Sequence, residues 1–163
     1  MDPSSGAELI RQIDSHLPPS PGLTFWWLGQ HSVVLRIGGT VVYIDPYLAP
    51  GPARRTPPAF SGEQVTNAHL VLCSHDHSDH IDPVAIPAIA QASPGAVFIA
   101  PKPAAGRMLS LGVPASRLLG LDDGEQMDVA GVNLTGIKAA HEFFDNPQEP
   151  RTREFLARVR AWA

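Results

Sequence analysis

The sequence predicts a layered α/β domain. Three observations lead to this prediction. Three short apolar segments of strand length, separated by turns, occupy the N-terminal part. A loop rich in histidine and aspartate follows a fourth such segment, and helical and strand patterns then alternate. With 163 residues, of which 44% are hydrophobic and 17% charged, the chain is long enough for one folded core and too short for two ordinary domains.

The N-terminal part predicts one helix and a β-meander. Leucine and isoleucine recur at helical spacing over residues 7–17, and three prolines between positions 18 and 21 end this helix. Gly38-Gly39 is a turn dipeptide between two apolar runs. Three strands are therefore expected, at 23–28, 32–37 and 40–44.

A long loop is expected over residues 47–62, which contain repeated proline and glycine. Arg54 and Arg55 lie within it. A long loop beside a functional site often contributes to substrate binding, and two arginines suit a phosphate or a carboxylate. Two solvated loop arginines are the alternative.

An apolar strand at 70–73 leads directly into a loop, Ser74 to His80, with three histidines and two aspartates. His75 and His77, at i and i+2, can both reach one cation, and Asp79 and His80 begin a second site. Because imidazole is the dominant ligand type, zinc or another borderline divalent metal is favoured over calcium or magnesium. A solvated histidine-rich tract is the alternative, but the position at a strand end favours a metal site.

Helices and strands alternate after this loop. Asp82-Pro83 resembles a helix N-cap followed by proline. Since Pro87 would lie too deep in a helix that began there, we expect a turn and then a helix that resumes near Pro87 and ends before Pro94. The later elements are expected to be a strand at 96–100, a helix at 103–111, and strands at 117–121, 126–129 and 132–139.

The loop from Ser74 to His80, called the metal loop below, resembles the metal-binding loop of a known superfamily. His75, His77, Asp79 and His80 match the His-x-His-x-Asp-His signature of the metallo-β-lactamase fold. The segments around it are similar to the L-ascorbate-6-phosphate lactonase-like branch of metal-dependent hydrolases: Trp27-Leu28-Gly29-Gln30, Ile44-Asp45-Pro46-Tyr47-Leu48, Ser74 to Pro83 and Ala140-His141-Glu142. The resemblance covers about residues 23–146 and implies a metallo-β-lactamase-like layered α/β sandwich.

The resemblance also implies roles for single residues. His141 falls where the family carries its third ligand, so His75, His77 and His141 are expected to hold the first metal, and Asp79 and His80 to begin the second. Asp79 is in addition the expected catalytic residue, which orients the attacking water or accepts its proton. Asp45 is expected to support the loop from behind the ligands, and Pro46 biases it toward an extended backbone. His31 is expected to be a non-ligand.

The chain departs from the family pattern after His141. Family members usually continue with another half that adds a metal-bridging aspartate and a final histidine. Here Asp145 is the only aspartate close after His141, and residues 151–163 have the pattern of a short amphipathic helix that supplies neither ligand. We therefore expect a truncated or half-sized version of the fold, with a helix and proline-rich lead-in at 1–22, the domain at 23–146 and an atypical helical tail at 147–163.

The expected function is hydrolysis of an ester-like bond, with one or two divalent ions, zinc or manganese, as cofactor. The substrate would be a small molecule, phosphorylated or not, and the electrophile a lactone or a phosphoester. A phosphodiesterase acting on phospholipid or nucleic acid is one alternative. The other is an inactive or split half-domain that acts as an assembly unit, either as a homo-oligomer or with a complementing half.

Charge and sequence pattern argue against nucleic-acid-binding and membrane-spanning proteins, and they set the expected cellular location. The net charge of −4 shows no basic bias toward nucleic acid or anionic membranes. No apolar run has the length of a membrane span, and the N-terminus lacks a secretory pattern, so a cytoplasmic protein is expected. Cys73, the only cysteine, cannot form an intramolecular disulfide and is expected to be a small core residue.

Overall fold

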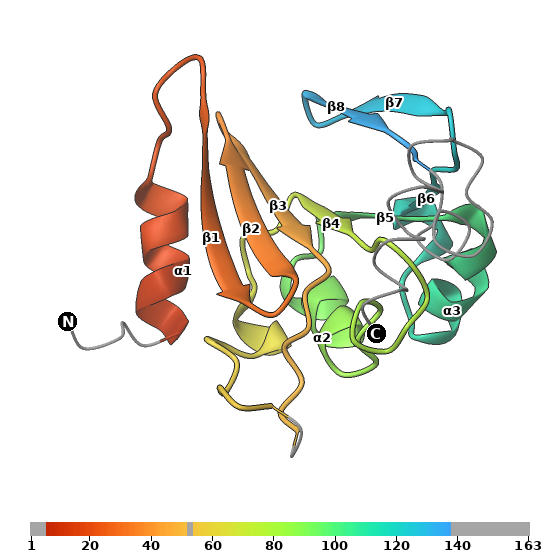
Figure 1. Cartoon of the computed structure of the whole chain (residues 1–163), viewed down its shortest axis with the longest axis horizontal. Helices are drawn as coiled ribbons and strands as arrows, with labels where there is room; N and C mark the ends of the chain where they lie inside the picture. The colour runs from red at the N-terminus through yellow and green to blue at the C-terminus, as the bar shows by residue number, and fades with distance from the viewer. Residues whose placement is uncertain (1–5, 52–53, 138–163) are drawn as a thin grey trace, which may run out of the picture.

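A six-stranded mixed sheet forms the centre of the molecule, with helices on one face and a β-hairpin on the other (Figure 1). The computed structural model describes residues 6–51 and 54–137. The strands lie in sequence order, from β1 at one edge to β6 at the other. The predicted α/β class and its layered arrangement are thereby confirmed.

Strand direction brings several strand ends to one edge of the sheet. The first three strands form the predicted antiparallel meander, and the others run parallel to the third. The strands are β1 (Leu23–Gly29), β2 (Ser32–Ile37), β3 (Thr40–Ile44), β4 (Leu70–Leu72), β5 (Val97–Ala100) and β6 (Leu118–Gly120). Because β1, β3 and β4 all point the same way, the segments that follow them meet at the same edge of the sheet.

The main core lies between the sheet and its helices. The helices are α1 (Gly6–Ser15), α2 (Ala85–Ala92) and α3 (Ala105–Ser110), with short 3-10 turns at Gly62–Gln64, Lys102–Ala104 and Ala115–Arg117. Fully buried side chains from both layers fill this space, among them Ile13, Val34, Ile89 and Phe98. None of the helices in the described ranges is long and apolar enough to cross a membrane.

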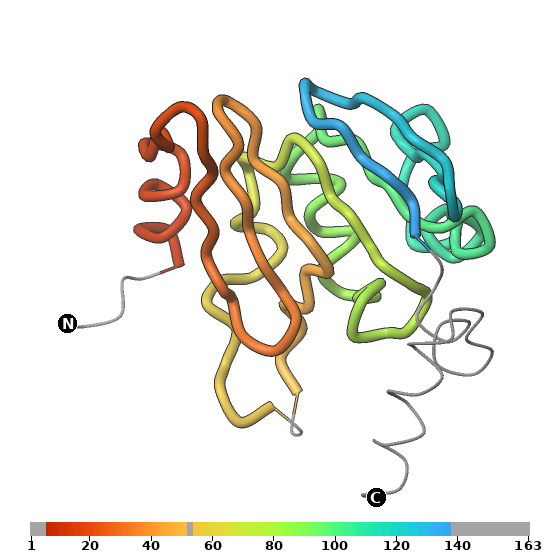
Figure 2. The backbone as a smooth tube through the Cα atoms, turned by 45° about the horizontal axis from the view of Figure 1, so that its top comes forward, coloured from red at the N-terminus to blue at the C-terminus, as the bar shows by residue number. Residues whose placement is uncertain are grey.

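The opposite face of the sheet is covered only in part. The hairpin of β7 (Gln126–Val129) and β8 (Val132–Thr135) packs on the middle strands, where Val42, Leu70 and Ile99 form a second core (Figure 2). The side chains of β1 on this face are not covered. Leu23, Phe25 and Trp27 are 52%, 63% and 68% exposed. The molecule therefore presents an apolar strip along its edge strand.

Most predicted elements are present, with shifts at their ends. The helix expected at 7–17 ends at Ser15, and the strand expected at 132–139 ends at Thr135 within the described residues. The helix expected to resume near Pro87 begins two residues earlier, at Ala85. Proline is compatible with this first turn, because the N–H that it lacks would have no partner inside the helix.

Candidate metal centre

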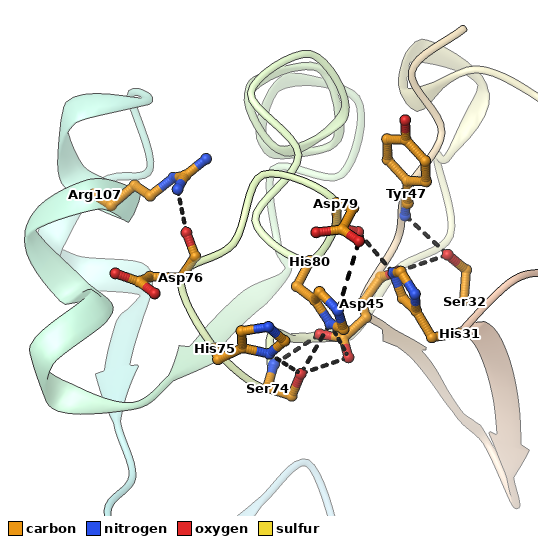
Figure 3. Close-up of polar contacts among 10 residues, drawn as sticks. All are labelled: His31, Ser32, Asp45, Tyr47, Ser74, His75, Asp76, Asp79, His80 and Arg107. Atoms are coloured by element: carbon orange, nitrogen blue, oxygen red, sulfur yellow. Dashed lines mark hydrogen bonds and ion pairs between the residues drawn. The ribbon is translucent and has the colours of Figure 1, made fainter. Parts of the chain in front are cut away.

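Three segments meet at the edge of the sheet described above (Figure 3). The turn between β1 and β2 contributes His31, the end of β3 contributes Asp45, and the loop after β4 contributes residues 74–80. They are distant in the sequence and close in space, because the sheet places their strands side by side. The predicted loop thus lies where a rigid scaffold can hold it.

Asp45 is the anchor of this arrangement. Its buried carboxylate accepts hydrogen bonds from the backbone N–H of Ser74 and from the Ser74 hydroxyl, both at 2.7 Å. Its other neighbour is Nδ1 of His80, at 2.9 Å. The Ser32 hydroxyl donates to the Asp45 carbonyl at 2.7 Å. Asp45 therefore ties β2, β3 and the metal loop together.

The backbone of Asp45 differs from the expectation. Its φ is +44°, in the left-handed region, whereas proline at the next position was expected to favour an extended conformation. Aspartate tolerates this region better than most residues, and the hydrogen bonds to its carboxylate and carbonyl hold it there. Such strain is common where a side chain must be aimed at a functional site.

The hydrogen bonds of Ser74 select the tautomers of two histidines. The Ser74 hydroxyl has one proton, which it donates to Asp45. Nδ1 of His75 and Nδ1 of His80 each lie 3.0 Å from the same hydroxyl oxygen. Both Nδ1 atoms must then carry the proton of their hydrogen bond, which leaves Nε2 of each neutral ring without one. Both rings are thereby prepared to offer Nε2 as a ligand atom.

The histidine rings of the loop form one group. The ring centroid of His75 lies 4.4 Å from that of His77 and 3.8 Å from that of His80. Burial and the neighbouring rings of His80 and His77 lower the pKa of His75 below its ordinary value. Asp79 points a carboxylate oxygen toward the same group, with Oδ2 4.0 Å from Nε2 of His80. The predicted residues His75, His77, Asp79 and His80 are thus brought together.

Two further side chains hold the loop from outside. The guanidinium of Arg107, on α3, donates to the carbonyl oxygens of Asp76 and Ile81, so it connects the middle of the loop with the residue that follows it. The carboxylate of Asp82 is fully buried and accepts from the backbone N–H groups of Val84 and Ala85 at the start of α2. Its second oxygen accepts from two N–H groups after β3, those of Leu48 and Ala49.

His31 lies within the cluster, although we expected it to be a non-ligand. Its Nε2 is 2.7 Å from the carbonyl oxygen of Asp79, and its ring stacks on that of His80 at 3.9 Å. We expected His31 to stand close to this edge of the sheet, but not to contact Asp79, which it precedes by 48 positions. The strand order could have indicated this contact, because β1 and β4 point the same way and the segments that follow them lie at the same edge of the sheet.

Arg54 lies beside this group. Its guanidinium packs over the ring of Tyr47 at 4.6 Å and donates to the Tyr47 carbonyl at 2.8 Å. The Tyr47 ring in turn stacks near His31, with centroids 6.3 Å apart. Arg54 is therefore an ordered part of its loop, whereas Arg55 is exposed. His141 and Asp145 lie outside the described residues, as does the tail that was predicted to be helical.

The donor set fits a divalent metal. Imidazole nitrogens dominate, one carboxylate is present, and the hydrogen bonds of two rings direct Nε2 away from Asp45 and Ser74. Nitrogen-rich sets with one oxygen ligand suit zinc and other borderline metals. His31, Asp79 and His80 also offer three ligand atoms within 4.8 Å of one another.

Comparison with known proteins agrees with the predicted family and fold. The model of the beta-lactamase superfamily domain matches residues 24–158. The chain therefore belongs to the metallo-β-lactamase superfamily, in the branch of the L-ascorbate-6-phosphate lactonase-like metal-dependent hydrolases.

Two curated relatives illustrate this branch. A probable L-ascorbate-6-phosphate lactonase of Shigella boydii is 26% identical over 84% of this chain and 47% of its own length. A metal-dependent hydrolase of Azorhizobium caulinodans is 31% identical over 71% of this chain and 48% of its own. The chain thus spans less than half the length of these relatives.

Solved structures share the fold at low sequence identity. A metallo hydrolase of Ignicoccus hospitalis is 21% identical and matches with a TM-score of 0.51, over 68% of this chain and 46% of that one. CmlA, a diiron β-hydroxylase of Streptomyces venezuelae, is 20% identical with a TM-score of 0.57, over 78% and 26%. At such identities the likeness concerns the fold alone.

Proposed function

We propose that this chain carries the metal-binding part of a hydrolase that cleaves an ester-like bond in a small molecule. The observation that carries the proposal is the hydrogen-bond network of Asp45 and Ser74, which leaves Nε2 of His75 and of His80 unprotonated, with Nε2 of His80 4.0 Å from Asp79. Such a network has a clear use in metal ligation, since ligating histidines usually bind an oxygen acceptor through their other nitrogen.

Each residue has a role in this proposal. His75 and His77 hold one cation together with His141, and Asp79 and His80 belong to a second. A bound zinc or manganese ion would supply Lewis-acid activation of water and of the substrate oxygen. The carboxylate of Asp79, about half exposed, can orient the attacking water and accept its proton. Asp45, Arg107 and Asp82 keep the loop in position.

The substrate proposed first is a lactone, as for the lactonase named among the relatives. A phosphoester is the second candidate, because the guanidinium of Arg54 lies on Tyr47 beside the histidine cluster. A positive charge at that position suits an anionic group on the substrate. Phosphodiester hydrolysis in phospholipid or nucleic acid belongs to the same proposal.

A non-catalytic role as an assembly unit is a further candidate. The exposed strip of Leu23, Phe25 and Trp27 on β1 favours it, because an apolar surface of this kind often contacts another polypeptide. Another half-domain or a second copy would fit this surface. Turnover by the purified chain alone would contradict a purely structural role.

The test combines metal content with turnover. The purified chain is loaded with zinc or manganese, freed of excess metal, and assayed with a panel of lactones and phosphodiesters. We expect bound metal by elemental analysis and hydrolysis that a chelator removes. His77→Ala should lose the hydrolysis and the cation that His75 and His77 hold, whereas His16→Phe, at an exposed histidine outside the cluster, should keep both. Absence of metal, or equal turnover by His77→Ala, would contradict the proposal.

A further inference from the structure

Arg54 has a guanidinium of which one part is fixed and another part has no partner. Nη1 donates to the Tyr47 carbonyl at 2.8 Å, and Nε donates to the Thr56 carbonyl at 3.2 Å. The backbone N–H of Arg54 donates to the carbonyl of Gly51 at 3.1 Å. Among the described residues, Nη2 has no hydrogen-bond acceptor, and no carboxylate lies within ion-pair distance of the guanidinium. The positive charge is thus held in place without a neutralising partner from this part of the chain.

Two other arginines show what a purely structural guanidinium does here. Arg107 directs both terminal nitrogens to backbone carbonyl oxygens, those of Asp76 and Ile81. Arg117 does the same with carbonyl oxygens near the end of α2. Arg54 differs, because the N–H groups of its second terminal nitrogen stay available. A planar guanidinium with available N–H donors matches the geometry of phosphate and carboxylate groups.

Tyr47 holds Arg54 close to the metal centre. The guanidinium packs over the Tyr47 ring at 4.6 Å. The backbone N–H of Tyr47 is shared between the Asp45 carbonyl at 2.8 Å and the Ser32 hydroxyl oxygen at 3.0 Å. The Tyr47 ring faces that of His31, at an interplanar angle of 21° (Figure 3). Because Tyr47 and Arg54 are partly buried and held on several sides, they lose little conformational freedom when a ligand binds.

The contacts between Arg54 and the metal loop pass through two rings. Arg54 contacts Tyr47, Tyr47 faces His31, and His31 stacks on His80 with centroids 3.9 Å apart. Among the described residues, Arg54 forms no hydrogen bond with the loop itself. An anion bound by Arg54 would therefore lie apart from the atoms that react at the loop. Binding energy from such a remote group contributes to substrate specificity.

We propose that Arg54, positioned by Tyr47, binds a phosphate or carboxylate group on a part of the substrate that does not react. This inference rests on the proposed function and narrows its substrate class to lactones and other esters that carry a separate anionic group. Arg55 is the natural comparison, because it is the next residue in the chain, is exposed, and has none of the contacts of Arg54 in the described structure.

The first test compares three lactones that differ only in the end of one side chain, which is a phosphate, a carboxylate or a hydroxyl. The zinc-loaded wild type is assayed beside Arg54→Met, Arg54→Lys and the control Arg55→Met, and thermal unfolding checks that each variant folds. We expect the ratio of kcat/KM for the anionic lactones to that for the neutral one to fall about 10- to 100-fold in Arg54→Met. Arg54→Lys should lose less, because it keeps the charge without the planar donors. Arg55→Met should keep the wild-type ratio.

The second test needs no turnover and no metal. The Nε–H signal of Arg54 in the NMR spectrum of the metal-free chain is identified by its absence in Arg54→Lys, and it is followed during titration with inorganic phosphate and with acetate. We expect a saturable shift in the wild type and in Arg55→Met. The tighter of the two anions, together with the better of the two anionic lactones, identifies the group that the subsite takes.

Several outcomes would overturn the inference. One is a wild type that hydrolyses the neutral lactone as well as the anionic ones, which would leave the proposed function intact. Another is an equal loss for anionic and neutral lactones in Arg54→Met, since Arg54 would then only support its loop. An equal loss of the ratio in Arg55→Met would point to general charge attraction instead of a subsite. If the wild type hydrolysed none of the lactones, the proposed lactone substrate would be wrong, and the titration would decide the inference: a saturable shift supports anion binding by Arg54, and no shift refutes it.

Discussion

Asp45 combines a strained backbone with a dense set of hydrogen bonds. Its left-handed φ turns the chain sharply at the end of β3, and its carboxylate faces the metal loop. A carboxylate that accepts the Nδ1–H of a histidine raises the basicity of the opposite nitrogen and fixes the ring. The single residue thus shapes both the backbone at the end of β3 and the proposed ligand atom of His80.

Replacement of Asp45 by asparagine should weaken metal binding more than it weakens the fold. Asparagine also tolerates the left-handed region, but its neutral amide is a poorer acceptor for Ser74 and His80. We expect zinc affinity to fall about 10- to 100-fold, as measured by competition with a chromogenic chelator. Asp128→Asn, at an exposed position of β7, is the control. Equal affinity in the two variants would mean that Asp45 acts on the backbone alone.

Cys73 should be unreactive in the folded protein. It is 4% exposed, and burial, followed by the nearby Asp45 carboxylate, raises the pKa of its thiol. Since the thiolate is the reactive form, both effects slow alkylation. We expect a thiol reagent at pH 8 to label the chain only after denaturation. Rapid labelling of the native protein would show that the strand before the metal loop opens readily.

At the scale of elements, Asp82 joins three parts of the molecule. One oxygen accepts from the N–H groups at the start of α2, and the other holds the segment after β3, while the residue itself lies just after the metal loop. A buried carboxylate with four N–H donors is favourable only because all its hydrogen bonds are made. The relative position of these elements therefore depends on one side chain.

Asp82→Asn places an N–H₂ group against donors that need an acceptor. We expect the free energy of unfolding to fall by roughly 2 to 3 kcal/mol, measured by urea denaturation of the metal-free protein. The matched control is Asp123→Asn in the exposed turn before β7, where a change within about 0.5 kcal/mol is expected. Equal losses in both variants would contradict the anchoring role of Asp82.

The elements were predictable where local sequence determines them. Strands β1 to β3 follow from apolar runs and the Gly38-Gly39 turn, and the loop after β4 follows from its histidine spacing. The start of α2 was less predictable, since Pro87 looks disruptive until its place in the first turn is known. The backbone of Asp45 and the place of His31 depend on contacts across the sheet, which no local pattern contains.

At the scale of the whole molecule, the two faces of the sheet differ in cover. Helices cover one face, where Val34 is fully buried. The other face is covered by the β7–β8 hairpin over the middle strands only. Val33 and Val34 are neighbours in β2 and point to opposite faces. They allow the same substitution to be compared on both sides.

Val34→Ala should destabilise the protein more than Val33→Ala. Val34 is fully buried against the helices, so the loss of two methyl groups should cost roughly 2 to 3 kcal/mol. Val33 is partly exposed and faces Trp27 across the strand pair, so we expect about 1 kcal/mol or less. Thermal and urea unfolding of both variants measure the difference. A larger loss for Val33→Ala would indicate that another surface covers this face in solution.

The two hydrogen bonds from Arg107 on α3 to Asp76 and Ile81 have a consequence for local opening of the structure. If α3 opened locally, the carbonyl oxygens of Asp76 and Ile81 would lose their shared donor. A cation that favours the ordered loop would therefore also favour the closed helix, by the same coupling free energy in both directions. Cation binding at this edge of the sheet would then slow amide hydrogen exchange in α3, a helix that supplies none of the proposed ligands.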